Sequence, residues 1–275
     1  MRIDAHQHFW KISRGDYDWL TPDITSLYRD FGPDDLAPLL HAQGVDGTIL
    51  VQAAPTLAET HYLLSLVETC DFVKGVVGWV DFDDVNSPQM ITTVAKHSKL
   101  VGLRPMIQDI SDPDWMLQDQ LAQAYSAMIE NDLVFDALTK PIHLSNLVEL
   151  GKRHPKLSVV IDHASKPQIA DGQFDDWAED ITKIANETSM YVKLSGLVTE
   201  AGPNWNIDKL RPYVAHLLAE VGHSRLIWGS DWPVCTMACS YAHWCDTVDT
   251  LLADLNSDEK SAIFGGNAAK LYGVT

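Results

Sequence analysis

Basic residues are scarce in this chain of 275 residues, and their scarcity excludes two classes of partner. Lys and Arg together number 20 against 38 Asp and Glu, which gives a formal net charge of −18 at pH 7. A chain with this charge repels both the phosphate backbone of nucleic acids and the surface of anionic membranes. We therefore expect neither nucleic acid nor a membrane as a partner.

Long hydrophobic runs and cysteine pairs are also missing. No stretch approaches the roughly 18 apolar residues that a membrane-spanning helix needs, and the N-terminal MRIDAHQHFW lacks the basic and apolar regions of a signal peptide. The four cysteines, at positions 70, 235, 239 and 245, include no C-x-x-C pair, and such cysteines are typical of reduced thiols. The sequence predicts a cytoplasmic protein and leaves its oligomeric state open.

Three common catalytic or cofactor motifs are absent as well. No G-x-G-x-x-G follows the first apolar run, no G-x-x-x-x-G-K-[ST] occurs, and no G-x-S-x-G is present. Dinucleotide binding, a phosphate-binding P-loop and serine-triad hydrolysis therefore have no support.

What the chain does have is a regular alternation of short apolar runs and longer segments with helical spacing. The apolar runs, continuous as in the buried strands of a parallel sheet, are residues 2–5, 48–52, 73–80, 100–104, 133–137, 157–161, 190–194 and 225–228. The helical segments are residues 34–43, 57–70, 117–131, 144–154, 174–187, 207–221, 241–255 and 258–271. Eight such alternations predict an α/β protein, a (β/α)8 TIM barrel that forms a single domain over residues 1–275.

Polar residues stand where nearly every predicted strand ends. In a (β/α)8 barrel the carboxyl ends of the strands form one face, and active sites lie on it. A full ring of polar side chains at these ends is hard to explain by core packing. Its members in strand order include His6, His8, Gln52, Arg104, Asp136, His163, Lys193 and Asp231.

His6, His8 and Asp231 are the strongest candidates within this ring. His6 and His8 are two residues apart on a strand, so their imidazoles point the same way and can share a metal ion or bind a substrate oxygen. Asp231 lies between two tryptophans and precedes Pro233, which suits a general base or a metal ligand. The alternatives are histidines bonded to backbone and an aspartate that caps a helix.

Two further residues at strand ends carry charge or a transferable proton. His163 is expected to face the same mouth of the barrel, and the planar guanidinium of Arg104 can bind a carbonyl, hydroxyl or carboxylate. Lys193 has two interpretations, a direct role at the site or an interior lysine paired with a carboxylate.

The H-x-H after the first strand, the His after the sixth and the Asp after the eighth resemble the amidohydrolase superfamily. The match narrows to its sugar-lactonase branch, whose members open L-fucono- and L-rhamnono-lactones and, more distantly, 2-pyrone-4,6-dicarboxylate lactone. It covers essentially the whole chain and is carried by the strings DAHQHFW from position 4, VQA from 51, GWVD from 78, GLR from 102, DHASKP from 162, KLSGLVTE from 193 and GSDWPV from 229.

The resemblance implies a hydrolase that opens a sugar-derived lactone to its aldonic acid. In that mechanism Asp231 is the general base on a water, while His8, His163 and Arg104 stabilise the oxyanion. As our own hypothesis, we expect Trp19, Gln52, Gln108, Lys193 and Glu200 to contact the substrate.

The resemblance leaves open whether the site binds a metal ion. His6, His8 and Asp231 would hold one divalent ion, Zn²⁺, or catalysis would need none. Arg104 and Asp136 stand where two-metal members carry a bridging lysine and a histidine, which disfavours a second ion.

Three other functions remain. A 2-pyrone-4,6-dicarboxylate lactonase would need several arginines to hold two carboxylates, and only seven arginines occur, of which Arg104 alone clearly ends a strand. The others are a metal-dependent decarboxylase of the same superfamily and a barrel that binds sugar without catalysis.

Overall fold

The computed structural model describes residues 1–275, and its central feature is one sheet of eight parallel strands in chain order. The strands are β1 (Ile3–Gln7), β2 (Gly47–Val51), β3 (Val73–Gly78), β4 (Leu100–Leu103), β5 (Val134–Ala137), β6 (Val159–Ile161), β7 (Tyr191–Leu194) and β8 (Leu226–Trp228). Each begins and ends within two residues of its predicted run. Nearly every strand residue is buried, as expected for a parallel sheet covered on both faces.

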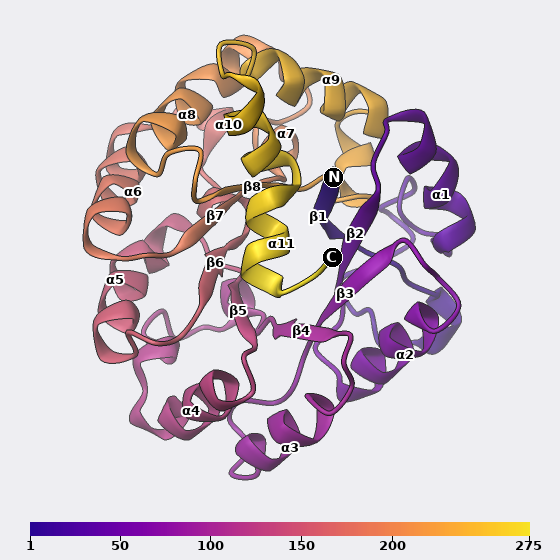
Figure 1. The fold of residues 1–275 in the computed structure, drawn as a ribbon, viewed down its shortest axis with the longest axis vertical. Coiled ribbons are helices and arrows are strands. Elements are labelled where there is room, and N and C mark those ends of the chain that lie inside the picture. The colour runs from indigo at the N-terminus through magenta and orange to yellow at the C-terminus, as the bar shows by residue number, and fades with distance from the viewer.

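Helices surround this sheet, as Figure 1 shows. They are α1 (Pro33–Ala42), α2 (Leu57–Val67), α3 (Ser87–Val94), α4 (Ala122–Glu130), α5 (Leu144–Arg153), α6 (Asp175–Glu187), α7 (Leu197–Glu200), α8 (Ile207–Glu220), α9 (Tyr241–Leu251), α10 (Ser257–Ser261) and α11 (Asn267–Tyr272). None of them has both the length and the apolar character that crossing a bilayer would require. The predicted (β/α)8 barrel is confirmed.

Three helical predictions need correction. The helices α3 and α7 lie where no helix was predicted, and with eight and four residues they are too short to show a clear helical period. The segment predicted from 117 begins as a helix only at Ala122, after two short 3₁₀ turns. The closing helix is interrupted at Ala262–Gly266, a π-type turn with two glycines, which separates α10 from α11.

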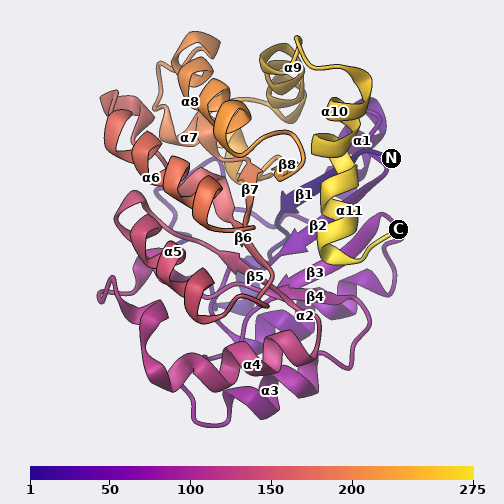
Figure 2. The same ribbon diagram turned by 60° about the vertical axis from the view of Figure 1, so that its left-hand side comes forward.

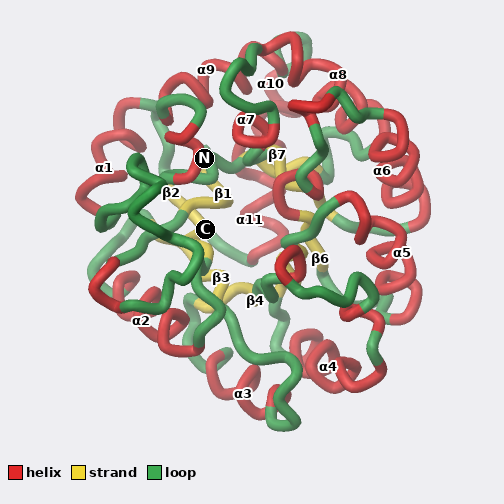
Figure 3. Tube along the Cα trace, turned by 180° about the vertical axis from the view of Figure 1, so that it is seen from behind, coloured by secondary structure: helices red, strands yellow, loops and turns green.

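The C-terminal helix α11 closes one end of the barrel. Ala268, Tyr272 and Val274 pack against apolar side chains that point into the barrel, such as Ile49 and Val160. Figure 1 shows α11 lying across the ring of strands, and Figure 2 shows it on the same side as both chain termini. This is the end at which the strands begin, so only the opposite end, seen in Figure 3, is free to hold a site.

The seam between β1 and β8 is closed by individual hydrogen bonds rather than by a regular ladder. The Asp231 amide donates to the His6 carbonyl at 2.7 Å, and the His8 amide donates to the Trp232 carbonyl at 2.7 Å. A Cβ on Gly229 would lie 2.7 Å from the His6 Cβ, so only glycine permits this approach. The seam therefore places Asp231 directly beside the histidines of β1.

Candidate active site

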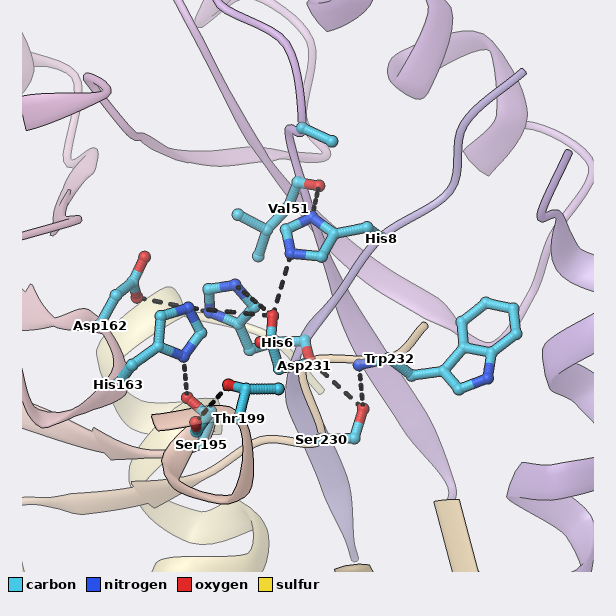
Figure 4. Close-up of polar contacts among 12 residues, drawn as sticks. His6, His8, Val51, Asp162, His163, Ser195, Thr199, Ser230, Asp231 and Trp232 are labelled. Atoms are coloured by element: carbon cyan, nitrogen blue, oxygen red, sulfur yellow. Dashed lines mark hydrogen bonds and ion pairs between the residues drawn. The ribbon is translucent and has the colours of Figure 1, made fainter. Parts of the chain in front are cut away.

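Three imidazoles surround one carboxylate oxygen at the carboxyl ends of the strands. The Nε2 atoms of His8, His6 and His163 lie 3.3, 3.7 and 3.8 Å from Asp231 Oδ1. All four side chains are buried, and Figure 4 shows the rings turned toward the carboxylate. The donor atoms of His6, His163 and Asp231 lie within 4.8 Å of one another, so this set could hold a metal ion.

Backbone and hydroxyl partners fix the orientation of two of these rings. His8 Nδ1 lies 2.7 Å from the Val51 carbonyl, which only accepts hydrogen bonds, so Nδ1 carries the hydrogen. The ring nitrogen directed at Asp231 is therefore Nε2. His163 Nδ1 lies 2.9 Å from Ser195 Oγ, which leaves its Nε2 free to face the carboxylate.

The turn that carries His163 has an uncommon backbone conformation. Residues 163–166 all have positive φ values, between 49° and 61°, at a cost of about 1–2 kcal/mol for each such residue. Hydrogen bonds hold the turn: Thr139 Oγ1 and Ser165 Oγ lie 2.9 Å apart, and Trp177 Nε1 donates to the Ala164 carbonyl at 2.8 Å. Strain of this kind is characteristic of functional sites.

Gly196 gives His163 the space for its ring. Its φ is +68°, and a Cβ there would lie 2.7 Å from His163 Nδ1. We expect Gly196→Ala to lose about 1–2 kcal/mol of stability and also to lose activity, because the methyl group displaces the ring.

Gly172 offers a matched control, since its φ is +67° but nothing lies within 4 Å of its Cβ position. Chemical denaturation and initial-rate kinetics on both variants separate the two effects. Gly172→Ala should lose stability alone. Full activity in Gly196→Ala would show that this contact does not position His163.

A buried charge network lies beneath the histidines. Lys193 Nζ is 2.5 Å from Asp136 Oδ2, 3.0 Å from Asp162 Oδ1 and 3.2 Å from His6 Nδ1. From the closed end of the barrel, the Tyr272 hydroxyl donates to Asp136 Oδ2 at 2.7 Å. Lys193 is therefore an interior lysine paired with carboxylates, the second of its two predicted interpretations.

Arg104 completes this network from β4. Its Nη1 lies 3.4 Å from Asp162 Oδ2 and 3.3 Å from His6 Nε2, and its Nη2 donates to the Gln52 carbonyl. Two cations thus face the two carboxylates of Asp136 and Asp162. The guanidinium forms part of the cavity wall, with both terminal nitrogens directed at protein groups.

Burial and neighbouring charges set the protonation of the site. Burial raises the pKa of Asp231, but the neighbouring His163, His8 and His6 outweigh it and hold that pKa below its usual range. Burial lowers the pKa of His163 to about 4 despite the nearby Asp231 and Asp162 carboxylates. Near neutral pH the site therefore holds an ionised Asp231 beside a neutral His163.

A cavity of about 170 Å³ opens above Asp231. This is below the roughly 300 Å³ at which pockets for drug-sized ligands begin, and it suits a single small ring. Its lining residues are His8, Trp19, Ala53, Arg104, Met106, Gln108, Leu138, His163, Lys166, Asp231 and Val234.

The cavity includes some of the predicted substrate contacts and not others. Trp19 and Gln108 line it. Gln52 and Lys193 are fully buried and do not reach its wall, and the Gln52 amide instead donates to the Arg104 carbonyl at 2.7 Å. Glu200 lies in α7, partly buried and outside the lining set, where burial raises its pKa.

Sequence reasoning missed Lys166 and the apolar part of the wall. Lys166 belongs to the DHASKP string after β6, and its spacing of three from His163 was the available signal. The apolar members, Ala53, Met106, Leu138 and Val234, carry no chemistry that would mark them in the sequence.

A larger hollow of about 500 Å³ lies elsewhere, around the start of α6. Its lining includes Asp175, Asp176 and Asp180 but no histidine and no cationic side chain. It lacks the convergent acid–base groups that mark the smaller cavity.

Comparison with known proteins gives consistent matches over the full chain. The sequence model of a family described as amidohydrolase matches residues 3–274. An L-fucono-1,5-lactonase of Burkholderia ambifaria is 43% identical over 99% of this chain and 96% of its own length, and one of Burkholderia multivorans is 36% identical over 100% and 96%. The crystal structure of an amidohydrolase from Burkholderia multivorans with bound zinc superposes with a TM-score of 0.92 at 36% identity, covering all of both chains.

Proposed function

The chain belongs to the amidohydrolase family, and we propose that it hydrolyses a sugar-derived lactone of the L-fucono-1,5-lactone kind to the free aldonic acid. One observation carries the proposal: an ionised, buried carboxylate, Asp231, lies among three imidazoles at the floor of a cavity that suits a single small ring. The relatives that share 43% and 36% of the sequence bear the name of this activity, in agreement with the sequence prediction.

Asp231 acts as the general base in this mechanism. Its depressed pKa keeps it ionised, so it can accept a proton from a water that attacks the lactone carbonyl carbon. The carbonyl oxygen becomes an oxyanion on the side of the cavity lined by His163 and Arg104. The bond from the carbonyl carbon to the ring oxygen then breaks, and Asp231 returns its proton to that oxygen.

The site fits one divalent ion. The Nδ1 atom of His8 is engaged with the Val51 carbonyl, so Nε2, which lies 3.3 Å from Asp231 Oδ1, is the ring nitrogen available to a cation. His6, His163 and Asp231 have donor atoms close enough to share such an ion, and His8 adjoins them, so we assign these four residues to Zn²⁺. When bound, zinc would add Lewis-acid polarisation to the site.

Proton release tests the function directly. Purified protein is assayed with L-fucono-, L-rhamnono-, D-arabinono- and L-galactono-lactones, with and without a chelator, and spontaneous ring opening is subtracted. We expect rapid turnover in one stereochemical series. No turnover across the panel would contradict the proposal and favour the dicarboxylate lactonase or the decarboxylase.

The assay with chelator and metal analysis of the same samples test whether the site binds zinc. We expect the purified protein to retain about one zinc ion per chain and the chelator to remove it. Protein that binds no zinc from solution would contradict the ligand assignment without affecting the proposed reaction.

A further inference from the structure

Lys166 is the one lysine in the wall of the cavity, and it is partly buried there. Its ammonium group makes no hydrogen bond and no ion pair within 4.0 Å, although its charge partly offsets the rise in pKa that burial gives Glu200. The two other cations near the mouth are already engaged. Arg104 is bound to Asp162 and to the Gln52 carbonyl, and Lys140 donates to the Gln108 carbonyl at 2.8 Å. A free cation on the wall is available to a ligand.

The left-handed turn after β6 explains how Lys166 reaches the cavity. Its amide donates to the His163 carbonyl at 2.8 Å and closes the turn. All four residues from His163 to Lys166 have positive φ values, so the unfavourable backbone conformation extends over the whole turn. His163 and Lys166, at the two ends of this turn, both line the cavity, so the same strain places both side chains.

The charge of the cavity changes during the proposed reaction. A sugar lactone is neutral, whereas its product carries a carboxylate. Asp231 is the only carboxylate in the cavity wall, and its interactions with His8, His6 and His163 already stabilise its charge. The product thus adds negative charge to a cavity in whose wall Lys166 is the cationic side chain without a hydrogen-bond or ion-pair partner.

We propose that Lys166 binds the carboxylate of the aldonate product at the position that the lactone carbonyl occupies before ring opening. This inference rests on the proposed function. The water oxygen bonds to the carbonyl carbon, and the ring oxygen leaves with one proton. The new acid group then ionises by releasing a second proton, so the product has two equivalent oxygens and one negative charge. The Lys166 ammonium donates hydrogen bonds to this group.

Calorimetric binding of L-fuconate and of L-fucitol tests the assignment. L-fucitol has the same hydroxyl groups at C2 to C5 and carries a CH2OH group in place of the carboxylate. Wild-type protein should bind L-fuconate more tightly, and Lys166→Gln should weaken that binding by about 10- to 100-fold while leaving L-fucitol within about twofold. The same variant should show a lower kcat/KM and weaker inhibition by product.

Two further variants separate binding from folding. Lys166→Arg keeps the charge and should retain most of the affinity for L-fuconate. Lys156→Gln removes an exposed lysine in the loop that precedes β6, far from the strand ends, and should change nothing. If Lys166→Gln unfolds, equal binding of L-fuconate and L-fucitol by the wild type would by itself overturn the proposal.

The outcomes for the two proposals are distinct. Lactone turnover by the wild type with unchanged L-fuconate binding in Lys166→Gln overturns the role of Lys166 alone. A wild type that opens no lactone overturns the proposed function, and its failure to prefer L-fuconate over L-fucitol would then remove the role of Lys166 as well.

Discussion

Replacing Asp231 with asparagine is expected to lower kcat/KM for the preferred lactone by about 10²- to 10⁴-fold, the range for loss of a general base. The amide cannot take a proton from water, whereas the carboxylate is kept ionised by the imidazoles of His6, His8 and His163. The backbone should be unaffected, because the φ of Asp231 is +59° and asparagine is among the residues that best tolerate this conformation. The bond from its amide to the His6 carbonyl is also retained.

Initial rates and thermal unfolding together check this prediction. Asp81→Asn is the matched control, since Asp81 follows β3 at the same face of the barrel but is exposed, and it should keep its activity. Near-wild-type turnover by Asp231→Asn would refute the mechanism. If Asp231→Asn loses turnover but still binds L-fuconate as the wild type does, binding and catalysis are separable. This result would argue against a barrel that only binds sugar.

The location of the site could be predicted from the sequence because, in a (β/α)8 barrel, the order of the strands along the chain is also their order around the barrel. The first and last strands are neighbours in a closed barrel, so His6 and His8 had to lie beside Asp231, and their Nε2 atoms are 3.7 and 3.3 Å from its Oδ1. The continuous apolar runs marked each strand, and the first polar residue after a run marked its carboxyl end.

Depth within the barrel was not predictable in the same way. Gln52 and Lys193 stand at strand ends like the other candidates, yet both are fully buried below the cavity. Whether a lysine at such a position faces ligand or carboxylate depends on neighbours from other strands, here Asp136 on β5 and Asp162 after β6. Those partners are more than 30 residues away in the sequence, and nothing local in the sequence indicates the pairing.

The left-handed turn was hidden for a different reason. Residues 163–166 are His, Ala, Ser and Lys, none of them the glycine that usually marks positive φ. Their conformation is imposed by tertiary contacts such as the bond from Trp177 Nε1 to the Ala164 carbonyl. Lys166 was therefore missed although its motif was recognised.

The buried network predicts that Lys193→Met will be among the most destabilising single substitutions, by about 3–5 kcal/mol, because it leaves buried carboxylates uncompensated. Asp136 and Asp162 would lose the ammonium that lies 2.5 and 3.0 Å from them. Urea unfolding at neutral pH measures the loss. A loss of less than about 1 kcal/mol would mean that the buried carboxylates do not depend on the Lys193 charge.

The pH dependence of this loss identifies its cause. Burial already raises the pKa of Asp136 to about 6 in the presence of Lys193, and removing the cation raises it further. A carboxyl whose folded pKa lies above its unfolded value costs stability as pH rises, so Lys193→Met should be less destabilised at pH 5 than at pH 8. The double variant Asp136→Asn, Lys193→Met should recover part of the loss at pH 8. If the recovery is absent and the loss is independent of pH, Lys193 contributes by packing rather than by charge.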